Sequence, residues 1–81
     1  MLSIETTTKL SPEEAIKRAR EFFGPQGYGL TVKREDVCCI EFSGGGGGVV
    51  VSAYPKKKGS TVSFESREWD YQVKEFIGKL K

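Results

Sequence analysis

The sequence predicts an α+β fold, in the order β-α-β-β-β-β-α, with a single curved antiparallel sheet that carries two helices on one face. Two observations lead to this prediction. Segments 12–23 and 69–81 repeat apolar residues at the spacing of an amphipathic helix. The stretch between them alternates apolar and polar residues in four runs that are separated by turn-forming residues. A chain of 81 residues has room for one thin core, so residues 1–81 are expected to form a single domain.

The first two elements are a strand and a helix. Segment 2–8, LSIETTT, alternates apolar and polar residues, which predicts a strand with Leu2 and Ile4 facing inward. In the helix that follows, Ser11 is expected to be the N-cap and Pro12 to occupy the first helical position. A glutamate three residues after Ser11 can complete a capping box, so the start of this helix is well defined by the sequence.

Four strands are expected next, and alternation again defines them. They cover residues 28–35, 37–42, 49–54 and 60–68. The links between them are short enough for hairpins, so these strands should form an antiparallel meander. The residues predicted to face inward are Tyr28, Leu30, Val32, Cys38, Ile40, Phe42, Val49, Val51, Ala53, Val62 and Phe64.

The C-terminal helix completes the predicted fold. Val73, Phe76, Ile77 and Leu80 share one of its faces. Each helix therefore has one apolar stripe, and both stripes are buried only if both helices lie on the same face of the sheet. The opposite face of the sheet is expected to remain bare.

This order of elements resembles the TATA-box-binding-protein-like arrangement, which is related in shape to the larger helix-grip folds. The resemblance covers the whole chain as an order of elements, and no motif residue carries it. It implies a curved antiparallel sheet with a long C-terminal helix, and it implies no function.

Composition excludes several classes of function. The chain has a net charge of +2 and no histidine, so it lacks both a strong basic field and the commonest general base and metal ligand. We expect no cofactor and no metal site. Cys38 and Cys39 fall in a predicted strand, where neighbouring side chains diverge, so they are expected to be free thiols. Free thiols, no recognisable signal peptide and no long apolar stretch together predict a cytoplasmic protein without a membrane partner.

The five glycines at 44–48 raise the question of a phosphate-binding loop. Such a loop needs Lys followed by Ser or Thr and then a helix, whereas valines and a strand follow Gly48. The glycines therefore predict a flexible hairpin loop, and their number points to positive φ angles or to close approach of another backbone. A partner-contacting loop at Gly46 and Gly47 is the alternative.

Three lysines, Lys56, Lys57 and Lys58, are expected at the tip of another hairpin. Lysines at such a tip usually keep the protein soluble and oppose pairing between sheet edges. The functional alternative is a contact with the phosphates of a nucleic acid, and Tyr54 would then stack on a base. The residues that would extend the basic patch are Lys33, Arg34 and Arg67.

The bare sheet face gives the function prediction. Its centre is expected at Val50, Tyr54 and Cys39, where an aromatic ring with apolar neighbours can anchor a partner. We predict a small binding or assembly module without enzymatic activity, which docks a second copy or another protein through this face and through the glycine and lysine loops. Nucleic-acid binding through the lysine hairpin is the alternative, and a thiol-dependent enzyme at Cys39 is a third hypothesis.

Overall fold

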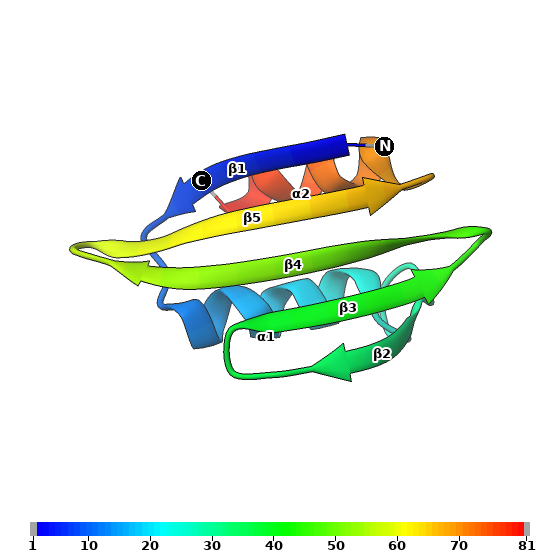
Figure 1. Cartoon of the computed structure of the whole chain (residues 1–81), viewed down its shortest axis with the longest axis horizontal. Helices are drawn as coiled ribbons and strands as arrows, with labels where there is room; N and C mark the ends of the chain where they lie inside the picture. Colours follow the sequence, from blue (N-terminus) through cyan, green and yellow to red (C-terminus); the bar gives the residue numbers. More distant parts are fainter. Residues whose placement is uncertain (1, 81) are drawn as a thin grey trace.

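Seven elements follow one another in the computed structural model, which describes residues 2–80. They are β1 (Leu2–Thr8), α1 (Pro12–Phe23), β2 (Thr31–Glu35), β3 (Cys39–Gly44), β4 (Gly47–Lys56), β5 (Gly59–Arg67) and α2 (Asp70–Leu80). Neighbouring strands are antiparallel throughout, and their order in the sheet is β1-β5-β4-β3-β2. Both helices lie on the same side of the sheet, behind it in the view of Figure 1. The predicted order of elements and the α+β architecture are therefore confirmed.

The core lies between the sheet and the helices. Helix α1 packs on β3, β4 and β5, whereas α2 packs on β5 and β1. The buried apolar residues are Ala15, Ile16, Ala19, Phe23, Leu30, Ile40, Phe42, Val49, Val51, Ala53, Val62, Phe64, Val73, Phe76, Ile77 and Leu80. Leu2, Ile4 and Val32 are half-buried against them. The predicted inward set is thus confirmed except at Tyr28 and Cys38.

Helix α1 begins where the sequence indicates. The Ser11 hydroxyl accepts a hydrogen bond from the Glu14 backbone N–H at 3.3 Å, and Pro12 is the first helical residue. The Glu14 carboxylate lies 3.8 Å from the Arg18 guanidinium, one turn further along the helix. The cap therefore satisfies one of the free N–H groups of the first turn, and the acidic side chain supports the exposed face instead.

The prediction that Tyr28 is an inward-facing strand residue is wrong. Tyr28 lies in the turn between α1 and β2, which begins only at Thr31, so the alternation of the strand does not extend to it. Its side chain is 43% exposed, and its hydroxyl donates a 2.7 Å hydrogen bond to the Glu75 carboxylate. Its ring packs edge-on against Phe22 and Trp69. Tyr28 therefore closes one end of the two-helix layer from outside the core.

The bond between Tyr28 and Glu75 predicts a measurable pH dependence. It raises the pKa of Tyr28 above the ordinary value of 10.0, because the phenol proton makes the bond and a phenolate would face a carboxylate. The stabilisation is therefore present below pH 10 and is lost as the pH rises through the higher pKa of the folded state. In a titration of phenolate absorbance, we expect Tyr28→Phe to remove the most alkaline step. Tyr54→Phe is the control, and an unchanged last step in Tyr28→Phe would contradict the assignment.

Candidate functional site

The face of the sheet opposite the helices is uncovered within residues 2–80, as Figure 1 shows from that side. We call it the open face. The side chains along it are Ser3, Glu5, Thr7, Thr31, Lys33, Arg34, Cys39, Glu41, Val50, Ser52, Tyr54, Thr61, Ser63, Glu65 and Arg67. Most are small or charged, so this face is flat and polar. The prediction of a bare sheet face is confirmed.

The three residues predicted as a docking centre are neighbours on the open face. Val50 and Tyr54 lie four residues apart on β4, about 14 Å along the strand, and Cys39 of β3 is paired with Ser52 between them. Val50 is half-buried and lies between Glu41 and Glu65 of the adjacent strands. Tyr54 is 50% exposed. The strands therefore place an exposed aromatic ring and a small apolar side chain in one row.

A β-bulge in β2 decides which basic residue lies opposite Glu41. Val32 lies opposite Phe42 and Arg34 lies opposite Glu41, so Lys33 is an extra residue between two registered pairs. The basic residue opposite Glu41 is therefore Arg34, where simple alternation places Lys33. Opposite charges directly across a strand pair contribute modestly to the stability of the sheet.

The cysteines differ from the prediction of free thiols. Cys38 and Cys39 are joined by a disulfide, and neither is free. The alternation argument fails because β3 begins at Cys39, so Cys38 belongs to the turn that follows the exposed Val37. Side chains diverge only where both residues have strand geometry. A nucleophile at Cys39 would need a free thiolate, which the disulfide removes. The cytoplasmic location was predicted partly from free thiols, so it has one argument fewer and stays a prediction.

The glycine run forms a tight turn, where a flexible loop was expected. Gly44 pairs with Gly47, and the two residues between them, Gly45 and Gly46, have φ angles of 57° and 80°. Such a two-residue turn with positive φ at both positions matches the twist of a hairpin. The predicted positive φ angles are therefore confirmed. We call residues 44–47 the glycine hairpin.

Trp69 fixes the glycine hairpin to the rest of the molecule. Its indole N–H donates a 3.0 Å hydrogen bond to the Gly44 carbonyl, and its ring lies 3.0 Å from the place where a Cβ on Gly45 would stand. A Cβ on Gly47 would overlap the backbone carbonyl of Arg67. The close backbone approach that the sequence indicated is thus confirmed. Gly46 is exposed, whereas Gly47 is half-buried in this packing, so of the two predicted contact residues Gly46 is the one that is free to meet a partner.

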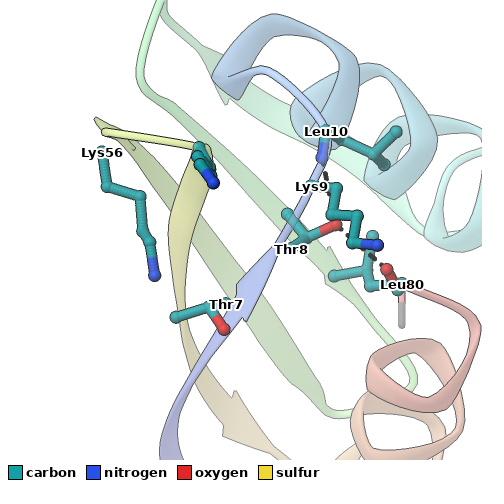
Figure 2. A pocket seen from close by; sticks show the side chains of 7 residues that line it. Thr7, Thr8, Lys9, Leu10, Lys56 and Leu80 are labelled. Atoms are coloured by element: carbon teal, nitrogen blue, oxygen red, sulfur yellow. Dashed lines mark hydrogen bonds between the residues drawn. The ribbon is translucent and has the colours of Figure 1, made fainter.

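Lys56, Lys57 and Lys58 lie at the end of the sheet opposite the glycine hairpin. Lys57 and Lys58 are the turn between β4 and β5, so the predicted hairpin tip is confirmed. A cavity of about 530 Å³ lies beside it, and Figure 2 shows Lys9 and Lys56 around this cavity. Lys58 also lines it. Sequence reasoning missed Lys9, because only the pairing of β1 with β5 brings the end of β1 to this hairpin.

The predicted basic patch is not continuous. Arg67 is paired with Gly48, at the glycine end of the sheet. It lies eight residues along β5 from Gly59, which corresponds to about 27 Å. Lys33 and Arg34 belong to the edge strand β2, separated from β4 by β3. The fold therefore gathers Lys9 with the hairpin lysines and leaves the other predicted basic residues elsewhere.

Comparison with known proteins gives no relative. No protein family model, curated protein or solved structure matches the chain. The likeness to the TATA-box-binding-protein-like arrangement therefore stays a prediction about the order of elements. Neither helix in the described part of the chain combines the length and the apolar character needed to cross a membrane.

Proposed function

We propose that the protein is a non-enzymatic assembly module whose open face docks a second copy of the same chain. The observation that supports this most is the bare sheet face itself. Both helices pack on the other side, and the open face carries a flat centre of Val50, Ser52 and Ser63 with Tyr54 beside it. Flat sheet faces pack on one another at a spacing of about 10 Å when their side chains are small.

The charges on the open face favour a second copy over an unrelated partner. The side of the face formed by β1 and β5 carries Glu5 and Glu65, with Arg67 only at the glycine end of β5, whereas the edge formed by β2 carries Lys33 and Arg34. A two-fold axis parallel to the strands places the β1 side of one copy over the β2 side of the other. The face therefore complements itself in charge under the commonest symmetry of homodimers.

The size of the face agrees with an interface. Five strands spaced by about 4.8 Å, each with about seven residues of 3.4 Å rise, cover on the order of 600 Å². A stable interface takes about 800 Å² of accessible surface from each partner. Since accessible area exceeds projected area, one open face supplies most of what a stable dimer needs.

Light scattering at increasing protein concentration tests this proposal. We expect a monomer–dimer equilibrium, and we expect Val50→Glu to weaken the dimer at least tenfold, about 1.4 kcal/mol, by burying a third carboxylate between Glu41 and Glu65 in the centre of the interface. Tyr71→Glu is the matched control, because Tyr71 is 74% exposed on α2, on the other side of the molecule. Circular dichroism checks that each variant is folded. The proposal is wrong if the protein is a monomer at every concentration, or if both variants weaken the dimer equally.

A second candidate function, nucleic-acid binding, is favoured by one observation. Lys9 joins Lys56 and Lys58 around a single cavity, so the lysine end is more basic than the sequence alone indicated. The mixed charge of the open face and the distance to Arg67 oppose a longer basic track. Binding of an oligonucleotide that weakens steeply with salt, and that is lost in Lys56→Gln/Lys58→Gln, would establish this alternative.

A further inference from the structure

We infer that the Cys38–Cys39 disulfide is an exchange site for small-molecule thiols, which open and close it reversibly. This inference does not depend on the proposed dimer. The disulfide lies at the turn that joins β2 to β3, at the end of the open face away from the glycine hairpin. The disulfide itself forms no part of the proposed dimer contact, although Val50 and Ser52 of that contact also line the cavity beside it.

A structural role does not explain this disulfide. A disulfide stabilises a fold mainly by restricting the unfolded chain, and the effect grows with the number of residues in the closed loop. Cys38 and Cys39 are neighbours, with Cα atoms 3.8 Å apart, so their bond closes the shortest loop that a chain allows. It joins no distant segments. The bond therefore adds little to the stability of the fold, and its reactivity is the property that points to a role.

The site is accessible to a small thiol. Both cysteines are half-buried, and both line a cavity of about 350 Å³ on the surface of the sheet. Exchange requires that a thiolate reach a sulfur atom from outside, so access is the first condition for it. Room for a molecule of a few non-hydrogen atoms is present beside the disulfide.

The charged groups around the cavity define which sulfur chemistry fits. Arg34 favours formation of a thiolate nearby, whereas Asp36 and Glu41 disfavour it. Arg34 lies opposite Glu41 in the register of the strands, and the lining carries one basic side chain against two acidic ones, so its charge is negative overall. An uncharged thiol or dithiol therefore meets less electrostatic opposition at this site than an anionic one.

The exchange balances with a dithiol as the reductant. One thiolate of the dithiol attacks a cysteine sulfur, the bond between Cys38 and Cys39 breaks, and a mixed disulfide and a cysteine thiolate form. The second thiolate of the dithiol attacks the mixed disulfide and leaves as part of a cyclic disulfide. Two electrons pass to the protein, and its two sulfurs take up two protons from solvent. An oxidised dithiol reverses the same steps.

Two backbone hydrogen bonds connect the disulfide to the fold. The Asp36 N–H donates to the Cys39 carbonyl, and the Ala53 N–H donates to the Cys38 carbonyl, both at 2.7 Å. These bonds close the β2–β3 turn and continue the pairing of β3 with β4. Opening the disulfide releases the peptide between the cysteines from a small ring. Both bonds should then open more often, while the centre of the sheet is unaffected.

Alkylation followed by mass spectrometry tests the inference on the whole protein. After equilibration with excess hydroxyethyl disulfide, an uncharged oxidant, and unfolding in the alkylating reagent, we expect no adduct. Reduced dithiothreitol added to the folded protein should produce two adducts in a single transition, at a rate within about tenfold of that for the urea-unfolded chain. In the reduced protein, amide hydrogen exchange should accelerate at Asp36 and Ala53 and stay unchanged at Val62. Cys38→Ser is the control, and it should carry one adduct after reduction.

Three results would overturn the inference. Two adducts after oxidation would show that the bond does not form, and cross-linked dimers would show that the cysteines react between molecules. Reduction only after unfolding, or more than a thousandfold slower in the folded protein, would show that the site is closed to small thiols. The rates are measured at a protein concentration at which light scattering shows a monomer, because a dimer through the open face would cover Val50 and Ser52, which line the same cavity.

Discussion

Replacing Phe23 by alanine should lower the free energy of unfolding by about 3–5 kcal/mol, which is much of the stability of a small domain. Phe23 is fully buried on α1, and its ring centre lies 5.5 Å from those of both Phe42 and Phe76. It therefore joins α1, the sheet and α2. Removing the ring leaves a cavity that three separate elements would have to close. Urea denaturation followed by circular dichroism measures the loss.

The control for this variant is Tyr71→Ala. Tyr71 is an aromatic residue of the other helix, but it is 74% exposed, so its removal should change stability by no more than about 0.5 kcal/mol. The comparison separates burial from aromatic character and from helix propensity. A loss below about 1 kcal/mol in Phe23→Ala would mean that the helices do not share one core with the sheet.

Gly47→Ala is expected to have the second largest effect, a loss of about 3 kcal/mol. The added Cβ would overlap the Arg67 carbonyl and would lie 2.8 Å from the Glu68 Cβ, so β4 and the end of β5 would have to separate. Backbone atoms cannot rotate away as a flexible side chain can. The measurement is again urea denaturation, with near-ultraviolet circular dichroism of Trp69 as a local probe of the glycine hairpin.

Gly46 and Gly78 provide matched controls for Gly47. A Cβ at Gly46 meets open space, so Gly46→Ala should cost only about 1 kcal/mol, which arises from its φ of 80°. Gly78 lies in α2 with open space around it and no positive φ, and Gly78→Ala should stabilise the protein by about 0.5–1 kcal/mol. Equal losses at Gly46 and Gly47 would contradict the packing described for the glycine hairpin.

Local patterns account for the part of the fold that the sequence predicted. Ser11 and Pro12 define the start of α1 because capping involves only neighbouring residues. Alternation from Ile40 to Phe42 and from Val49 to Ala53 predicts the buried face because a strand repeats every two residues. These signals lie within a few positions of the features they predict. These signals also predicted the bare face of the sheet, because the apolar stripes of both helices are buried only if both helices pack on the other face.

The features that were missed depend on contacts or boundaries that no local pattern shows. The predicted strand began at residue 37, two residues before β3 begins at Cys39. Cys38 was therefore treated as a strand residue, and its disulfide with Cys39 was not expected. The bulge at Lys33 shifts the register of β2, so that Arg34 takes the place opposite Glu41 that simple alternation gives to Lys33. Lys9 joins the lysine end only through the pairing of β1 with β5. The glycine run did signal close packing, but its partner Trp69 lies far along the chain.

The position of β1 next to β5 has a consequence for how the chain matures. Leu2 is paired with Ser66, 64 positions later, and the Thr8 hydroxyl donates a hydrogen bond to the Leu80 carbonyl. β1 is therefore synthesised well before β5, the strand beside which it lies, and before α2. The hairpins from β2 to β5 join residues that are close in sequence, and they can assemble while β1 is still unpaired. We therefore expect the docking of β1 to be a late step of folding, and a chain without α2 would still pair β1 with β5 but would leave Leu2 and Ile4 without the helix that packs beside β1.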